Sequence, residues 1–144
     1  MTRVVDASVV YKWFVQEQGT AEAMALRQGS RPLIAPDLIV SEVCNSAWKS
    51  FRRGEIDAGQ CKVIASMIEP ALTLIVPSTS LAVAAMQMAT ALDHPVYDCL
   101  YLALAQRERT ALVTADRRLL ARLVGTTWAG VAKAVVGVLP SRQR

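Results

Sequence analysis

Short apolar runs alternate with longer stretches of helical periodicity along this chain. The short runs are rich in β-branched residues and predict four strands, at 3–6 (RVVD), 32–36 (PLIAP), 72–77 (LTLIVP) and 110–116 (TALVTAD). The longer stretches predict helices over 8–15, 20–29, 37–54, 57–70, 78–92, 94–109 and 117–123. Strands that alternate with helices predict an α/β fold, here a three-layer α/β/α sandwich with a short, mostly parallel sheet.

Capping residues support several of these boundaries. Gly54 ends one predicted helix, Asp57 is the expected N-cap of the next, and Pro95 falls near the first turn of another. The pattern after about Leu123 is ambiguous, because residues 126–139 fit either a strand entering a helix or a helix alone. The sequence assigns no role to this tail.

Length and composition favour one globular domain over residues 1–144. The chain is 53% hydrophobic, which argues against disorder, and it has no linker or internal repeat. No apolar run is long enough to cross a bilayer, and the N-terminus lacks a signal-peptide pattern. A cytoplasmic protein that does not enter membranes is therefore expected.

The cysteines and the net charge narrow the possible chemistry. Cys44, Cys61 and Cys99 are far apart and form no CxxC pair, so they are interpreted as small buried hydrophobes and not as zinc ligands or a disulfide framework. The formal net charge of +4 mildly favours an anionic partner such as nucleic acid.

Four of the twelve acids are candidates for chemistry: Asp6, Glu42, Asp98 and Asp116. Asp6 closes the first predicted strand and Asp116 follows the last, so both are expected at the carboxyl edge of the sheet. Asp98 lies in the first turn of a helix that is apolar nearly all round, and Glu42 lies at the border of an apolar helical stripe.

Each acid taken alone also has a simpler explanation. Glu42 fits an exposed helical glutamate, Asp98 fits stabilisation by the helix dipole, and Asp116 fits an N-cap. Taken together, four converging carboxylates would repel one another and take up protons unless a cation joined them. Oxygen ligands without a cysteine or histidine cluster favour Mg²⁺ or Mn²⁺ over zinc.

The chain contains a single histidine, His94. A metal-free enzyme that uses two histidines as acid and base cannot be built from His94 alone. His94 precedes Pro95 and is interpreted as a loop or cap residue. The acids therefore remain the candidates for catalysis.

Four segments, spread over about residues 1 to 123, resemble the PIN-domain family, and more narrowly the toxin nucleases of VapBC toxin–antitoxin systems. They are VVDASV, PDLIVSEVCNSAWKSFRRGEI, PVYDCLYLALAQ and ALVTADRRL, in this order. The resemblance implies a PIN-like fold and a Mg²⁺- or Mn²⁺-dependent endoribonuclease. It gives the four acids as the catalytic set, with Ser8, Asn45 and Thr114 as supporting polar groups.

Within the set that the resemblance implies, Asp6, Asp98 and Asp116 are assigned to the metal, and Glu42 either reaches the ion or accepts a proton from the attacking water. Some members of the family carry another acid shortly after the fourth. In this chain those positions are Arg117, Arg118 and Leu119, so whether the site binds one metal ion or two remains open. Arg117 and Arg118 are candidates for contact with RNA.

The resemblance also implies partners. A cognate VapB-like antitoxin would lie in a groove near the acids, with the helices around Val9–Phe14 and Ile39–Phe51 as its walls, and a homodimer and a toxin–antitoxin hetero-oligomer are expected. Two alternatives stay open at this point. One is a PIN nuclease that acts in RNA processing or on structured DNA, and the other is a non-catalytic partner-binding module on the same fold.

Overall fold

A computed structural model describes residues 1–135 and shows a five-stranded sheet in which every neighbouring pair of strands is parallel. Along the sheet the strands are β3 (Leu74–Val76), β2 (Leu33–Pro36), β1 (Arg3–Val5), β4 (Leu112–Thr114) and β5 (Ala132–Ala134). Four of these strands lie within the predicted ones. The fifth falls in the ambiguous tail, where a strand and not a helix occupies 132–134, and residues 136–144 lie outside the described part of the chain.

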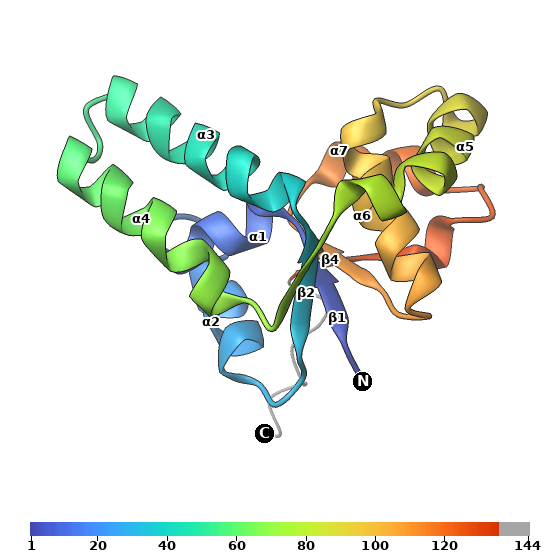
Figure 1. Ribbon diagram of the computed structural model, residues 1–144, viewed down its shortest axis with the longest axis horizontal. Coiled ribbons are helices and arrows are strands. Elements are labelled where there is room, and N and C mark those ends of the chain that lie inside the picture. The colour runs from blue at the N-terminus through green and yellow to red at the C-terminus, as the bar shows by residue number, and fades with distance from the viewer. Residues whose placement is uncertain (136–144) are drawn as a thin grey trace.

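The α-helices are α1 (Ala7–Val10), α2 (Thr20–Gln28), α3 (Leu38–Arg52), α4 (Ala58–Ala71), α5 (Ala82–Leu92), α6 (Val96–Arg107) and α7 (Arg117–Leu123). Short 3-10 turns are η1 (Tyr11–Trp13), η2 (Ser78–Ser80) and η3 (Ala129–Val131). α1 to α4 lie on one side of the sheet and α5 to α7 on the other (Figure 1). The predicted three-layer α/β/α sandwich is thus confirmed.

Local capping explains where several helices begin. Asp57 forms a reciprocal capping box with Gln60 at the start of α4, as its position in the sequence predicts. Asp37 precedes α3, but its carboxylate accepts a hydrogen bond from the backbone N–H of Ser78 at 3.1 Å instead of capping its own helix. The predicted helix over 78–92 is divided into the separate turn η2 and α5.

The buried side chains form one continuous core around α6. Its residues Cys99, Leu102, Leu104 and Ala105 are completely buried, because α6 packs on β1, β2 and β4 and is itself covered by α5. The nearly all-apolar sequence of this helix is accounted for by that position. All three cysteines are free thiols. None of the described helices is long and apolar enough to cross a lipid bilayer.

Candidate active site at the carboxyl edge of the sheet

The direction of the strand order reverses between β1 and β4, which are neighbours at the centre of the sheet. In open parallel sheets, such a reversal leaves a crevice beyond the carboxyl ends of the strands, and ligands bind there. Asp6 follows β1 directly, and Asp116 stands two residues after β4. Both strand-end acids therefore lie where the fold provides a site.

Asp6 is a buried carboxylate with three hydrogen-bond donors. Its side chain is the N-cap of α1 and accepts from the backbone N–H of Val9 at 3.3 Å. The Ser8 hydroxyl donates to Oδ1 at 2.5 Å, and the Thr114 hydroxyl donates to Oδ2. Asp6 is only 7% exposed. Its burial raises its pKa from 3.8 to about 6, against the effect of the hydrogen bonds, and the charge of Asp98 adds to the rise.

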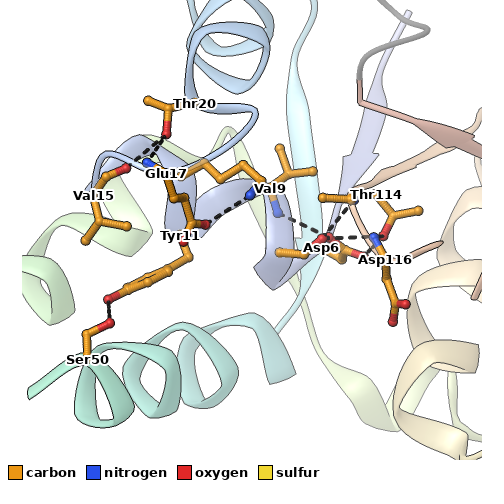
Figure 2. A network of polar contacts seen from close by, with 12 residues as sticks. Asp6, Val9, Tyr11, Val15, Glu17, Thr20, Ser50, Thr114 and Asp116 are labelled. Atoms are coloured by element: carbon orange, nitrogen blue, oxygen red, sulfur yellow. Dashed lines mark hydrogen bonds and ion pairs between the residues drawn. The ribbon is translucent and has the colours of Figure 1, made fainter. Parts of the chain in front are cut away.

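Thr114 links the two strand ends. It is completely buried and also accepts a hydrogen bond from the backbone N–H of Asp116 at 3.0 Å, beside its bond to Asp6 (Figure 2). Ser8 makes a parallel link, because its hydroxyl accepts from the backbone N–H of Ala115 at 2.9 Å. The two hydroxyls thus hold the Asp6 carboxylate and the loop after β4 together.

Glu42 reaches the same edge from α3 and is bonded to α6. The hydroxyl of Tyr101, whose side chain is 1% exposed, donates to Glu42 Oε1 at 2.5 Å. Partial burial raises the pKa of Glu42, and the charge of Asp98 raises it further. Burial raises the pKa of Tyr101 as well, so this phenol stays a hydrogen-bond donor. The simpler interpretation of Glu42 as a freely exposed helical glutamate does not hold.

Asp98 lies in the first turn of α6, as the sequence predicts, and is paired with the only histidine. His94 Nε2 and Asp98 Oδ2 are 2.7 Å apart, four residues from each other in the chain. The two side chains are 15% and 31% exposed, respectively, so the pair is partly accessible to solvent. The charge of Asp98 acts on both Asp6 and Glu42, which places these three acids in one electrostatic neighbourhood.

Asp116 serves as the N-cap of α7. Its Oδ1 accepts from the backbone N–H groups of Arg118 at 2.9 Å and Leu119 at 3.2 Å. Its carboxylate therefore points toward the start of α7 and away from Asp6 (Figure 2). The simpler interpretation as a cap is confirmed, and it leaves the second carboxylate oxygen available. Arg117 and Arg118 are both exposed at the beginning of this helix.

Asn45, the third predicted supporting group, lies one turn after Glu42 on α3 and is exposed. Within residues 1–135 its side chain makes no hydrogen bond. Of the supporting residues, Ser8 and Thr114 contact a candidate acid, and the role of Asn45 stays a prediction.

The donor chemistry of this edge fits a hard divalent cation. The four candidate acids offer only oxygen, and burial together with mutual repulsion raises the pKa of Asp6 and of Glu42, so a positive ion would relieve an existing cost. Among the described residues, no three side chains of His, Cys, Asp or Glu stand close enough to hold a metal ion. Each acid is instead engaged by a partner within the protein, such as His94, Tyr101 or the amides of α7.

Sequence reasoning missed His94 and Tyr101 as partners of the acids. For His94, the spacing of four residues from Asp98 was a usable signal. For Tyr101, the signal was a phenol inside an otherwise apolar helix, because a buried tyrosine hydroxyl requires a hydrogen-bond partner. The partner itself, Glu42, lies 59 residues away in the chain, so no local sequence pattern could identify it.

Comparisons with known proteins agree with this geometry. The sequence pattern of the PIN domain matches residues 3–124. Ribonuclease VapC3 of Pyrobaculum aerophilum is 31% identical over 121 residues, which cover 83% of this chain and 92% of the relative. Among solved structures, PAE2754 of Pyrobaculum aerophilum is similar with a TM-score of 0.68 and 23% identity, covering 95% of this chain and 85% of that one.

A second solved structure, of the sarcin–ricin-loop-cleaving toxin VapC20 of Mycobacterium tuberculosis, has a TM-score of 0.61 and 11% identity. It covers 79% of this chain and 88% of the other. At these identities the two structures support the fold. The 31% identity to VapC3, over 92% of that protein, supports common ancestry.

Proposed function

Because this chain belongs to the PIN-domain family, we propose that it is the toxin of a type II toxin–antitoxin system, an endoribonuclease that hydrolyses RNA phosphodiester bonds with Mg²⁺ or Mn²⁺. The observation that carries the proposal is the shared electrostatic neighbourhood of Asp6, Glu42 and Asp98 at the carboxyl edge of the sheet. A set of like-charged oxygen donors, of which Asp6 is buried and the others are partly buried, is costly to a fold unless it has a cationic ligand. The 31% identity to Ribonuclease VapC3 supports RNA as the substrate.

In this proposal Asp6 and Asp98 would hold the cation through carboxylate oxygens, and Asp116, which caps α7, would complete the shell directly or through water. When bound, the ion offsets negative charge that grows on the phosphate and makes nearby water more acidic. Ser8 and Thr114 fix the direction of the Asp6 carboxylate through their hydrogen bonds. His94 does the same for Asp98, holding Oδ2 and leaving Oδ1 for the site.

Glu42 is the acceptor for the proton of the attacking water. Its raised pKa brings its proton affinity closer to neutral pH, which suits a general base. The bond from Tyr101 occupies Oε1 and leaves Oε2 to receive the proton. Arg117 and Arg118, exposed beside Asp116, contact phosphates of the substrate.

The proposal includes a VapB-like antitoxin that covers the acids, a homodimer and a toxin–antitoxin hetero-oligomer. It also includes a cytoplasmic site of action, because the substrate is cellular RNA. A cationic side chain of the antitoxin placed near Asp6 and Asp98 would lower the same repulsion that a metal ion relieves, so the two would compete.

The test is cleavage of total cellular RNA by purified, antitoxin-free protein, with Mg²⁺ or Mn²⁺, with EDTA, and with Asp98→Asn. We expect cleavage by the wild type alone, abolished by EDTA and by the substitution. Cleavage that survives both would exclude this mechanism. If the wild type cleaves nothing, measured binding of Mn²⁺ separates a narrow RNA target from a non-catalytic module, which would bind no metal.

A further inference from the structure

Lys12 lies where two hollows in the surface adjoin. The first, which we call the α3 hollow, lies between α1–η1 and α3 and has a volume of about 310 Å³. The second, the β4 hollow, lies beside the end of β4 and has a volume of about 570 Å³. Three residues line both hollows: Lys12, Glu17 and Ala115. The junction of the hollows is therefore built around an ion pair, because Lys12 Nζ and Glu17 Oε1 are 3.0 Å apart.

This junction borders the groups that hold Asp6. Ser8 lines the α3 hollow and Thr114 lines the β4 hollow, and the hydroxyls of both donate to the Asp6 carboxylate. Lys12 follows Ser8 by four residues along α1 and η1. None of the described lining residues is a candidate acid. A ligand in the junction would thus lie next to the residues that support Asp6 and would leave the acids themselves free.

The Lys12 ammonium is mostly buried and has more donors than partners. Its side chain is 12% exposed. An ammonium group offers three N–H donors, and among residues 1–135 the bond to Glu17 is the sole hydrogen bond that Lys12 Nζ makes. A buried charge with unused donors is costly to a fold. Because Lys12 lines both hollows, an acceptor that enters either one can reach this side chain.

The loop between η1 and α2 fixes this lysine and its partner. The backbone of Gly19 is left-handed, with a φ of 89°, and a Cβ at this residue would lie 3.3 Å from Lys12 Cε. The stem of the lysine therefore packs directly on the glycine. The Thr20 hydroxyl accepts from the backbone N–H of Glu17 at 2.9 Å and donates to the carbonyl of Val15 at 3.1 Å (Figure 2). These contacts keep Glu17 beside Lys12.

The two hollows suit an anionic ligand. Their described lining residues include one acid, Glu17, and four cations, of which Arg53 is paired with Glu55: Lys12, Lys49, Arg53 and Arg117. The Glu17 side chain is 40% exposed, against 12% for Lys12. Water can therefore solvate the carboxylate when it leaves the pair, whereas the lysine needs an anionic replacement. A phosphate group is such a replacement, because it offers a negative charge and several acceptor oxygens.

We propose that Lys12 binds a phosphate group of the RNA substrate at this junction, and that Glu17 is the partner which the phosphate displaces. The inference rests on the proposed nuclease function and adds to it a substrate-binding residue outside the acidic set. In the exchange, Lys12 gives up a carboxylate and gains a phosphate, and the side chain of Glu17 turns into solvent. Glu17 therefore competes with the substrate for Lys12.

The first test measures how RNA binding depends on salt, in the Asp98→Asn background so that the RNA stays intact. The probe is a fluorescein-labelled single-stranded oligoribonucleotide that the wild type cleaves, followed by anisotropy between about 50 and 200 mM salt. Each phosphate contact to a single strand contributes about 0.7 to the slope of log Kd against log salt concentration, so Lys12→Met should reduce the slope by about 0.7. Lys62→Met is the matched control, because Lys62 is an exposed lysine on α4 that lines neither hollow, and its slope should equal that of the background.

The second test isolates the exchange between Glu17 and the phosphate. Glu17→Gln releases Lys12 without changing its packing on Gly19, so it should lower the Kd for the same RNA about 2- to 5-fold at low salt, the range that a partly exposed ion pair contributes. In the Lys12→Met background, Glu17→Gln should leave the Kd unchanged. Equal tightening in both backgrounds would mean that Glu17 acts only by general repulsion of RNA, which would overturn the exchange.

The binding role of Lys12 has its own contrary outcomes. A slope unchanged by Lys12→Met, or lowered as much by Lys62→Met, would overturn it. Should Lys12→Met fail to fold, an unchanged Kd with Glu17→Gln alone would overturn the proposal. Cleavage of the same RNA by the wild type separates the two levels of failure. Cleavage together with an unchanged slope removes only the inference about Lys12, whereas a wild type that neither binds nor cleaves RNA removes the nuclease proposal as well.

Discussion

The junctions β1–α1 and β4–α7 share one local design and differ in burial. In each, a buried strand is followed by an aspartate whose carboxylate accepts backbone N–H groups of the next helix. Asp6 is 7% exposed and also receives the hydroxyls of Ser8 and Thr114. Asp116 is partly exposed and receives only the helix amides.

This difference shows that a strand–aspartate–helix motif does not set the electrostatics of its acid. Desolvation does: it raises the pKa of Asp6 to about 6 even though three donors favour the charged form. Asp6 at neutral pH is therefore a charge that the fold holds at a cost. Asp116 is a cap that also stabilises its helix.

The largest expected effect is the difference in RNA cleavage rate between a variant at the β1–α1 junction and a variant at the β4–α7 junction. Asp6→Asn should lower the rate by more than about 100-fold, because in the proposed site it removes a charged ligand of the cation and not merely an outer contact. Asp116→Asn keeps the cap and should cost about 10-fold, since Asp116 contributes only one oxygen at the rim. Initial rates on the same RNA measure both. Equal losses of rate would mean that the burial of an acid does not determine how much it contributes to cleavage.

The second effect concerns the free energy of unfolding as a function of pH, in EDTA. The pKa of Asp6 is raised from 3.8 to about 6, so between these pH values the folded protein binds more protons than the unfolded chain. The contribution of Asp6 to stability therefore falls as pH rises through this window and stays low above it. Asp6→Asn should be more stable than the wild type at pH 8 by ~1–3 kcal/mol, and the gain should disappear near pH 4.

Urea unfolding at several pH values measures this difference. Asp116→Asn is the control, and it should show no gain, because a negative charge at the start of α7 is favourable. A wild type as stable as Asp6→Asn at pH 8 would contradict the cost assigned to the buried carboxylate. Addition of Mn²⁺ should stabilise the wild type and not Asp6→Asn.

The third effect concerns the buried hydroxyl group of Tyr101, which donates a hydrogen bond to Glu42. Tyr101→Phe keeps the ring in the core and removes the donor to Glu42 Oε1, so the rate should fall about 10-fold, mainly in kcat. Tyr97→Phe is the matched control, because Tyr97 lies on the same helix and is 59% exposed. A rate unchanged by Tyr101→Phe would show that Glu42 needs no orientation by this phenol.

The smallest effect isolates the capping role of Asp116. Asp116→Ala and Asp57→Ala each remove an N-cap and should each cost about 1 kcal/mol of stability. Only Asp116→Ala should also reduce cleavage, since Asp57 begins α4, away from the strand ends that carry the acids. Thermal unfolding and a cleavage assay on the two variants test this. Reduced cleavage in both would attribute the effect to stability alone.

Local patterns were enough to predict the layers of the fold and the positions of the strand-end acids. Asp6 could be placed because β-branched residues precede it, and α6 because its apolar character requires burial. Contacts between segments that are distant in the chain could not be predicted from local patterns. The bond from Tyr101 to Glu42 spans 59 residues, and the bond from Ser78 to Asp37 spans 41, so neither left a trace in any one window. β5, with the sequence AKA, is too short to carry a periodic pattern.

The hydrogen bond between Thr114 and Asp6 spans 108 residues, and this separation has a consequence for synthesis. β1 is made first, yet one of its two neighbours is β4, so its pairing is completed only when residues 112–114 have left the ribosome. Domains fold as units while the chain emerges, and contacts between its distant parts form late. The nascent chain thus has no assembled acid centre until most of its length is translated, which delays nuclease activity at the ribosome that makes it.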